Sequence, residues 1–414
     1  MDLGTLFQGI GTLFLVEPKI AIARILLIFL GIVLVFLGKK GTLEPLIMIP
    51  MGFGMAAVNA GMLVLPGDII GTIFMDSLAG TQDVAGADIT STPAGAAALF
   101  DALQIDFLQP IYTFMFSNGL IACLVFMGIG VISDIGNVLR FPFTSMLIAM
   151  FAELGSVLTF PIARAMGLDL GAAAAISIVG GADGPMVLYS SLMLAPELFV
   201  PITIIAYLYL SLCYGGYPFL IRLMIPKNLR GQVVKTAQAD ITSKEKIIFD
   251  VVAGTLLCLL FPVAAPLFLS FFLGNAIKES GVTKYAELLE NVFLYASTFL
   301  LGLLLGILCD AATLLNPEIL PLLVLGILAL LISGIGGIIG GYVVWLINGK
   351  KFNPVIGIAG VSCVPSTAKV AQKEAAKANK RCTILQYAMG ASICGVITTA
   401  ILTGLYIAVL KPLI

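Results

Sequence analysis

The sequence predicts an all-α polytopic membrane protein, and three observations support this fold class. Apolar side chains make up 60% of the 414 residues and charged ones only 11%, less than half the charged share of about 25% found in soluble domains. The apolar residues gather in runs of about 20, the length at which a helix crosses a bilayer. Lys and Arg are absent from one long stretch and concentrated in others, which is typical of loops on opposite membrane sides.

Nine apolar runs are long enough to span a bilayer. In chain order they cover residues 20–37, 45–65, 110–132, 144–163, 197–224, 247–274, 291–309, 319–348 and 383–409. Residues 3–16 are expected to form an interfacial amphipathic helix. Two further segments, 171–195 and 353–368, are too polar or too interrupted for ordinary spans and too apolar for ordinary loops. We predict a broken helix in each.

The distribution of charge predicts which loops face which side. No Lys or Arg occurs between Gly41 and Leu139, and the polar segment 66–109 carries six aspartates, so this segment is expected to face outward. The basic segments 226–246 and 369–381 are expected to face the cytoplasm. Counting the spans between them, these three segments reach their expected sides only if a broken segment also crosses part of the bilayer.

An internal repeat relates the two interrupted segments. The residues Ile176-Ser-Ile-Val-Gly180 precede Pro185, and the similar Ile356-Gly-Ile-Ala-Gly360 precede Pro365 at an offset of 180 residues (356 − 176). A second pair has nearly the same offset: Gly130-Val-Ile-Ser-Asp134 and Gly306-Ile-Leu-Cys-Asp310. Gly/Pro-interrupted segments in corresponding halves indicate a transporter binding site, so we expect two inverted-topology repeats.

The expected organisation has three parts. Residues 1–109 form N-terminal spans with an acidic outward loop. Residues 110–246 form repeat 1 with the broken helix 171–195, and residues 247–414 form repeat 2 with the broken helix 353–368.

Composition excludes several classes of function. The chain has no histidine, which excludes zinc hydrolases and Ser-His-Asp enzymes. The 22 basic and 23 acidic residues argue against nucleic-acid binding. Seven scattered cysteines without a CxxC pair are expected to be small buried hydrophobes, so no transition-metal site is expected.

The first interrupted segment places a carboxylate within a helix break. Three glycines and a proline in Gly180-Gly-Ala-Asp183-Gly-Pro185 would unwind a helix, and irregular backbone at membrane depth survives only when protein or water covers it. A carboxylate there costs about 2.5–3.5 kcal/mol on the insertion scale, so Asp183 is a candidate functional residue. The alternative is a tight turn at a membrane surface.

The second interrupted segment supplies neutral oxygen ligands. Asn353-Pro-Val-Ile-Gly357 and Gly360-Val-Ser362 contribute an amide, a hydroxyl and carbonyls released by proline and glycine. Together with one carboxylate from the first break, hard oxygens of this kind suit Na⁺. The alternative is a polar helix cap at the interface.

Four further acids lie in or beside apolar runs: Glu44, Asp134, Glu153 and Asp310. Acids within a membrane are functional by default. Asp134 and Asp310 are nevertheless expected at span ends, where capping explains them. Glu153 is more interior, and for it a functional role stays open.

These motifs together resemble the β subunit of the biotin-dependent, sodium-pumping decarboxylases, which act on oxaloacetate, methylmalonyl-CoA, glutaconyl-CoA or malonate. The resemblance covers nearly the whole chain. Its matching motifs are Glu44-Pro45 with Pro50-Met-Gly-Phe-Gly54, Asn118-Gly119, Phe126-Met-Gly-Ile-Gly130 with Asp134, Gly180-Gly-Ala-Asp183-Gly-Pro185, Asn353-Pro-Val-Ile-Gly357, Ala359-Gly-Val-Ser362 with Val364-Pro365, and Ala388-Met389-Gly390.

The resemblance implies an elevator-type, inverted-repeat fold in the bacterial cytoplasmic (inner) membrane. It also implies partners: a carboxyltransferase α subunit, a biotin carrier protein and a small γ or δ membrane subunit, with a homo-oligomer of β subunits also allowed. No Ala/Val-Met-Lys-Met biotinylation motif occurs in the chain, so carboxybiotin is expected from a separate carrier. The other expected cofactor is Na⁺.

The resemblance also assigns roles to residues. It implies catalytic roles for Asp183, Tyr209 and Lys369, and Na⁺ binding by a set that comprises Asp183, Asn353, Gly357, Ser362 and Ser392. The sequence departs from the family pattern where Lys369 replaces a common arginine, Gln386-Tyr387 replaces a Met-His pair and Ser392 replaces a usual asparagine. Tyr209 lies in a tyrosine-rich stretch, so interfacial anchoring is an equal alternative for it.

The expected activity is that of a membrane subunit of a decarboxylase, in which proton uptake during decarboxylation of carboxybiotin is coupled to outward Na⁺ transport. Asp183 would hold Na⁺ or a proton, but not both. A stand-alone Na⁺-coupled transporter for an organic anion is the alternative. A structural membrane anchor would leave both broken segments unexplained.

Overall fold

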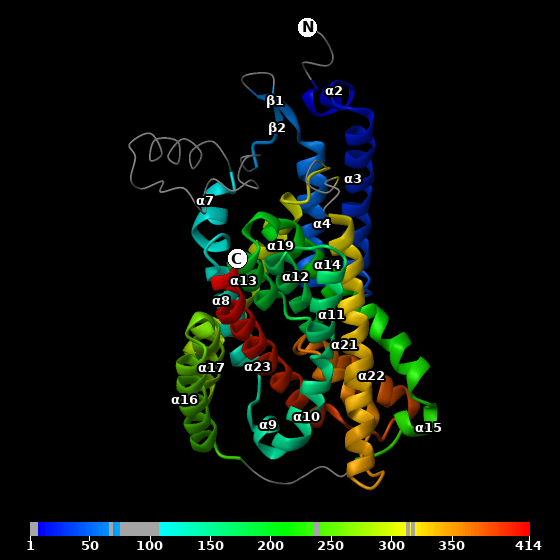
Figure 1. The fold of residues 1–414 in the computed structure, drawn as a ribbon, viewed down its shortest axis with the longest axis vertical. Helices are drawn as coiled ribbons and strands as arrows, with labels where there is room; N and C mark the ends of the chain where they lie inside the picture. The colour runs from blue at the N-terminus through cyan, green and yellow to red at the C-terminus, as the bar shows by residue number, and fades with distance from the viewer. Residues whose placement is uncertain (1–6, 66–68, 75–106, 235–240, 312–314, 316–318) are drawn as a thin grey trace. The chain divides into compact units, whose positions relative to one another are not determined.

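The computed structural model describes residues 7–65, 69–74, 107–234, 241–311, 315 and 319–414 (Figure 1). The described chain is helical apart from one hairpin of β1 (Leu63–Leu65) and β2 (Ile69–Gly71), which pair antiparallel with Leu63 opposite Gly71. The chain divides into two compact units. The aspartate-rich part of the segment 66–109 lies outside the described residues, so its outward placement stays a prediction.

The first unit comprises Met1–Ile121, Pro196–Ile204 and Ser297–Leu320. Helices α3 and α4 lie side by side in it (Figure 1). The buried Arg24 of α3 donates to the carbonyl of Asn59 in α4 at 3.0 Å, which satisfies a charged group inside the pair. The elements within this unit are α2 (Gln8–Leu15), α3 (Pro18–Lys39), α4 (Pro45–Ala60), β1, β2, α7 (Gln109–Ile111), the π-helical turn η1 (Tyr112–Phe116) and the 3₁₀ turn η3 (Pro196–Leu198).

The second unit comprises Ala122–Ala195, Ile205–Ala296 and Pro321–Ile414, and both broken segments lie in it. Four helices are shared between the units along the chain: α8 (Leu120–Ile132), α14 (Phe199–Met224), α19 (Leu294–Ile307) and α21 (Ile319–Ile347). The α-helices within the second unit are α9 (Gly136–Arg140), α10 (Pro142–Ala152), α11 (Leu154–Ala165), α12 (Leu170–Ser177), α13 (Gly184–Leu194), α15 (Lys227–Arg230), α16 (Ser243–Leu260), α17 (Ala265–Glu279), α18 (Thr283–Leu288), α22 (Ser366–Ala378) and α23 (Leu385–Leu410). Its 3₁₀ and π-helical turns are η2 (Ile178–Gly181), η4 (Pro262–Ala264), η5 (Leu289–Phe293), η6 (Pro354–Gly360) and η7 (Lys411–Leu413).

The helical, polytopic fold class is confirmed for the described residues. Five helices are long and apolar enough to cross a membrane: Pro18–Lys39, Pro142–Ala165, Thr283–Ile307, Ile319–Ile347 and Leu385–Leu413. The count rises to seven if each of two bent pairs is one span. These pairs are Gln109–Phe116 with Leu120–Ile132, bent by 63°, and Pro196–Leu210 with Cys213–Met224, bent by 54°.

The predicted runs 110–132 and 197–224 coincide with these bent pairs and are not straight single helices. Two further predicted runs differ from the structure. The run 45–65 is too long, because α4 ends at Ala60 and residues 63–65 form a strand. The run 247–274 is wrong as a single span. Helix α16 ends before Phe261, and α17 begins at Ala265 and lies beside α16 (Figure 1). Pro262 lies two residues after this end, and proline disfavours the helical conformation of the residue before it, here Phe261.

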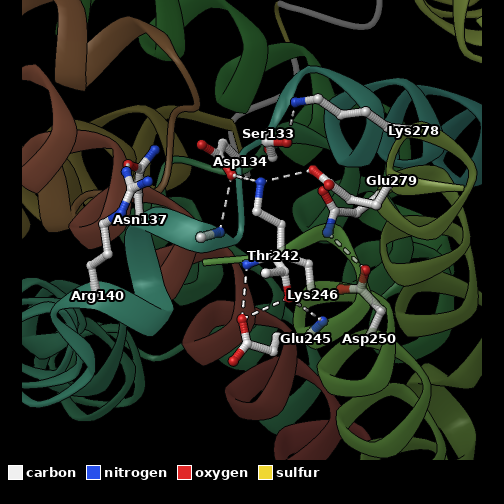
Figure 2. A network of polar contacts seen from close by, with 12 residues as sticks. Ser133, Asp134, Asn137, Arg140, Thr242, Glu245, Lys246, Asp250, Lys278 and Glu279 are labelled. Carbon is white, nitrogen blue, oxygen red and sulfur yellow. Dashed lines mark hydrogen bonds and ion pairs between the residues drawn. The ribbon is translucent and has the colours of Figure 1, made fainter. Parts of the chain in front are cut away.

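A polar network joins the ends of α8, α16 and α17 (Figure 2). Lys246 Nζ lies 2.7 Å from Asp134 Oδ1 and 3.0 Å from Glu279 Oε1. Lys278 donates to the carbonyl of Ser133 at 2.8 Å. Asp134 Oδ1 also accepts from the backbone N–H of Gly136 at 3.0 Å, at the start of α9. Asp134 therefore lies just after the end of α8, as expected, but the N-cap of α9 is Ile135 and that helix has no side-chain cap.

Candidate functional site

The first broken segment has the interruption that its glycines and proline predict. Helix α12 ends at Ser177 and runs into the 3₁₀ turn η2, after which Ala182 takes a left-handed conformation with φ 55°. Asp183 then caps α13: its side chain accepts from the backbone N–H of Met186 at 3.4 Å, and Pro185 lies in the first turn. The carboxylate of Asp183 is only 4% exposed. The break therefore holds a buried carboxylate.

The second broken segment begins at a buried amide. Asn353 Oδ1 accepts from the N–H of Val355 at 3.0 Å and so caps η6. Its Nδ2 donates to the carbonyls of Arg230 and Gln232 at 3.0 and 2.9 Å. Asn353 thus fastens the start of the break to the end of α15 and to the segment after it, with both ends of its amide engaged.

Gly357 brings η6 into direct contact with α21. A Cβ atom at Gly357 would lie 2.1 Å from the carbonyl oxygen of Gly337 and 2.8 Å from the nitrogen of Gly341. Both neighbours are backbone atoms that cannot rotate away. Gly357 is therefore required by packing, and its own carbonyl belongs to a segment held tightly against α21.

The two broken segments are hydrogen-bonded to each other at Ser362. Its backbone N–H and its hydroxyl both donate to the carbonyl of Gly181, at 3.0 and 2.5 Å. Ser362 Oγ also lies 3.1 Å from Thr399 Oγ1 of α23. All three residues lie in the second unit, and Ser362 is almost fully buried. The carbonyl of Gly181 in the first break thus accepts hydrogen bonds from Ser362, a predicted Na⁺ ligand of the second broken segment.

Tyr207, rather than Tyr209, contacts the Asp183 segment. A Cβ at Gly184 would lie 2.6 Å from the hydroxyl of Tyr207, so that ring packs directly on the residue after Asp183. Tyr209 faces α21, where its ring fills the space beside Gly326. Residues two apart on a helix point to different sides. The role of Tyr209 stays a prediction, while Tyr207 is a residue that the sequence analysis did not select.

Neither Lys369 nor Ser392 takes part in the contact between the two broken segments. Lys369 is exposed on α22, after the second break. Ser392 is completely buried on α23, and its Oγ makes no hydrogen bond within the described part of the chain. Ser392 and Thr399 are seven residues apart, which places them on one face of α23. That face contacts the two breaks through Gly395 and Thr399.

Glu153 is a second buried carboxylate at the same place. It stands between α10 and α11 and is 7% exposed. Thr399 Oγ1 donates to its Oε1, and it lies close enough to Asp183 for an electrostatic interaction between the two carboxylates. The sequence analysis left its role open. Its position in an apolar run was the signal that could have selected it.

A cavity of about 450 Å³ lies elsewhere in the second unit, and none of the seven predicted site residues lines it. The aromatic rings of Phe141 and Tyr387 stack at its wall with a centroid distance of 3.8 Å. The cavity is therefore distinct from the junction of the two broken segments.

Comparison with known proteins gives a consistent family. Residues 23–410 match the family model described as Na⁺-transporting oxaloacetate decarboxylase beta subunit. The carboxybiotin decarboxylase of Malonomonas rubra is 53% identical over 409 residues, covering 99% of this chain and 98% of that protein. The oxaloacetate decarboxylase beta chain of Haemophilus ducreyi is 31% identical over 99% of both chains. The methylmalonyl-CoA decarboxylase subunit beta of Veillonella parvula is 35% identical over 70% of this chain and 77% of that one.

Proposed function

Because the chain belongs to the family of Na⁺-transporting oxaloacetate decarboxylase beta subunits, we propose that it couples decarboxylation of carboxybiotin to outward Na⁺ transport across a bacterial cytoplasmic membrane. The resemblance inferred from the motifs is confirmed, as is the expectation of a membrane subunit of a decarboxylase. A relative named carboxybiotin decarboxylase that covers almost the whole chain supports biotin-linked chemistry in particular.

One observation carries the mechanism: the carbonyl of Gly181, two residues before Asp183, accepts both donors of Ser362. A buried carboxylate and the neutral oxygens of a second break are thereby held within one unit. A single carboxylate with hydroxyl and carbonyl oxygens suits a monovalent hard cation. Asp183, Ser362 and Ser392 are the proposed Na⁺ ligands of this set, and Asn353 and Gly357 position the backbone of the second break.

Asp183 provides a way to couple Na⁺ to a proton. The N–C bond of carboxybiotin breaks, CO₂ leaves, and the ureido nitrogen keeps the electron pair and takes up a proton. A carboxylate buried without a counter-ion favours its protonated form. Na⁺ and the proton therefore exclude each other at Asp183, and their exchange moves them in opposite directions. Tyr209 and Lys369 are proposed to assist at the decarboxylation step.

The proposed architecture has two inverted repeats that work by an elevator-type movement, with the divisions 1–109, 110–246 and 247–414. The repeated motif around Gly180 and Gly360 supports it, since both copies fall in interrupted helices. The proposed partners are a carboxyltransferase α subunit, a separate biotin carrier protein and a small γ or δ membrane subunit, in line with relatives named as beta chains.

The proposed function is tested by Na⁺ uptake into inverted vesicles that contain the whole complex. Decarboxylation should drive uptake, and avidin should stop both. The substitution Asp183→Asn should abolish Na⁺-dependent decarboxylation, while carboxyl transfer by the α subunit persists. Coupled pumping by Asp183→Asn would contradict the assignment.

The stand-alone transporter for an organic anion is disfavoured, since the relatives that cover the chain are named as decarboxylase subunits. It predicts solute uptake by this chain alone, without a response to avidin. That result in the same vesicles would replace the proposed function.

A further inference from the structure

Around Glu153, the oxygen atoms that can accept a hydrogen bond outnumber the hydroxyl hydrogens that can be donated. Thr399 Oγ1 contacts Glu153 Oε1, the carbonyl of Gly395 and Ser362 Oγ, and Ser362 Oγ also contacts the carbonyl of Gly181. Each hydroxyl has one hydrogen to donate. While Glu153 is ionised, these four oxygen–oxygen contacts share two hydroxyl hydrogens, and two of the contacts bring lone pairs together unless a bound proton or cation meets them.

Further oxygens at this place lack a partner as well. Glu153 Oε2 and the hydroxyl of Ser156 make no hydrogen bond within the described residues. Both side chains are more than nine-tenths buried, and the Ser156 side chain is within interaction range of the carboxylate. A buried carboxylate oxygen without a donor is costly unless a positive charge or a proton meets it.

The backbone segments that carry these oxygen atoms are in direct contact. A Cβ at Gly180 would lie 2.5 Å from the nitrogen of Ser156, and a Cβ at Gly181 would lie 2.5 Å from the side chain of Thr399. The start of α11, the first break and α23 therefore contact one another directly beside Glu153. Because all of these residues belong to the second unit, the cluster is formed within one compact part of the chain.

We propose that this cluster is a monovalent cation site of the Na⁺ class in which Glu153 is the charged ligand. Thr399, Ser362, Ser156 and the carbonyl of Gly181 supply its neutral oxygens. The inference rests on the proposed function in that Na⁺ is the transported ion, but it assigns a carboxylate outside the predicted set. Asp183, within electrostatic range of Glu153, remains the carboxylate at which Na⁺ exchanges for a proton, and Glu153 is a second carboxylate beside it.

The direct test is ²²Na⁺ binding to the purified full-length chain in detergent. The wild type should bind ²²Na⁺ that excess Na⁺ displaces and that K⁺ or choline at equal ionic strength does not. Glu153→Gln, which keeps the shape of the side chain, should weaken binding at least about tenfold. Thr399→Val should weaken it to a smaller extent, because it removes one neutral ligand. Glu287→Gln, an exposed acid in α18, is the matched control and should bind like the wild type.

A second readout separates a cation ligand from a structural acid. Na⁺ and protons compete for a carboxylate, so the apparent Na⁺ affinity of the wild type should fall as the pH is lowered, and Glu153→Gln should weaken that dependence. The titratable side chains that lie within electrostatic range of Glu153 in the described structure are Asp183 and Tyr406. Glu287→Gln, the exposed control, should keep the wild-type dependence on pH.

Several outcomes would overturn the inference. They are wild-type-like binding by Glu153→Gln and no specific binding by the wild type. If Glu153→Gln does not yield monodisperse protein, Thr399→Val decides, and its unchanged affinity counts against the site. Absence of avidin-sensitive Na⁺ transport by the wild-type complex would instead refute the proposed function, and it would leave the binding result standing.

Discussion

At the scale of single residues, the glycines of the first break matter because atoms of other segments occupy the space of a side chain, and at Gly180 these are backbone atoms. Gly180 is the sharpest case, since the nitrogen of Ser156 and the carbonyl carbon of Gly155 would lie 2.5 and 2.7 Å from an added Cβ. Rotamer changes cannot relieve such a contact. Either α11 or the break must shift.

The substitution Gly180→Ala should therefore lower stability by about 1–3 kcal/mol, the usual cost of overpacking, and should reduce Na⁺ binding with it. Gly216→Ala is the control, because Gly216 lies in α14 with no heavy atom within 4 Å of an added Cβ. Thermal unfolding of both purified variants measures the difference. Equal midpoints for the two variants would show that the break is loosely packed.

Ser362→Ala should separate the two donors that reach Gly181. The backbone N–H of Ser362 remains, so the breaks stay in contact, but the hydroxyl bond to the Gly181 carbonyl is lost. We expect a stability loss of about 0.5–1.5 kcal/mol together with weaker Na⁺ activation of decarboxylation. Ser280→Ala removes an exposed hydroxyl at the end of α17 and should change neither. Unaltered Na⁺ activation in Ser362→Ala would remove this hydroxyl from the site.

The sequence could identify the residues whose chemistry is unusual for a membrane, but not the partners that meet them. Asp183 was selectable because a carboxylate stands between glycines and a proline in an apolar run. Tyr207 and Tyr209 look alike in the sequence, and only the packing of Gly184 against Tyr207 distinguishes them. Thr399 is one of many hydroxyls in an apolar helix, and its contact with Glu153 spans 246 residues of chain.

At the scale of elements, α22 is anchored by an acid that faces inward. Glu374 is completely buried, and its carboxylate accepts two hydrogen bonds from Arg222 at 2.8 Å and one from Lys377 at 2.7 Å. These bonds, that of Arg222 above all, lower the pKa of Glu374 to about 2 from its ordinary value of 4.5. The basic segment 369–381, which is predicted to face the cytoplasm, thus has one face fixed to the end of α14.

Glu374→Gln should lower the thermal stability of the chain at neutral pH, because it removes the charge that Arg222 and Lys377 meet. A carboxylate with a lowered pKa stabilises the fold above the pKa of the unfolded chain and loses this effect as the pH falls through the folded value. The difference between wild type and variant should therefore be full above about pH 4.5 and shrink towards pH 2. Melting curves across this range measure it. A difference in melting temperature that does not change with pH would show that the variant loses stability through the shape of the side chain and not through its charge.

Element boundaries were predictable where proline or glycine marks them. The breaks at 171–195 and 353–368 follow from such residues. The error at 247–274 has the same origin: Pro262 and Pro266 were included in one apolar run, although they turn the chain back so that α17 packs on α16. Hydropathy sums the apolar content of a window and does not distinguish one long helix from two short ones.

At the scale of the whole molecule, the two units are not continuous in sequence, because each is assembled from three segments. The predicted divisions 1–109, 110–246 and 247–414 are continuous. An internal repeat describes sequence similarity, whereas compact units reflect contacts between distant segments. The two descriptions therefore answer different questions, and the inverted-repeat arrangement stays a prediction.

The proposed exchange of Na⁺ for a proton makes a prediction that only the complete complex can test. In inverted vesicles, Na⁺ moves into the lumen during decarboxylation. If Asp183 carries the consumed proton across the membrane in the opposite direction, the lumen should become alkaline as Na⁺ accumulates. A pH-sensitive dye trapped in the lumen measures this, with avidin as the control that stops both signals. Na⁺ uptake with no change in luminal pH would show that the proton comes from the cytoplasmic side, and Asp183 would then bind Na⁺ without carrying the proton.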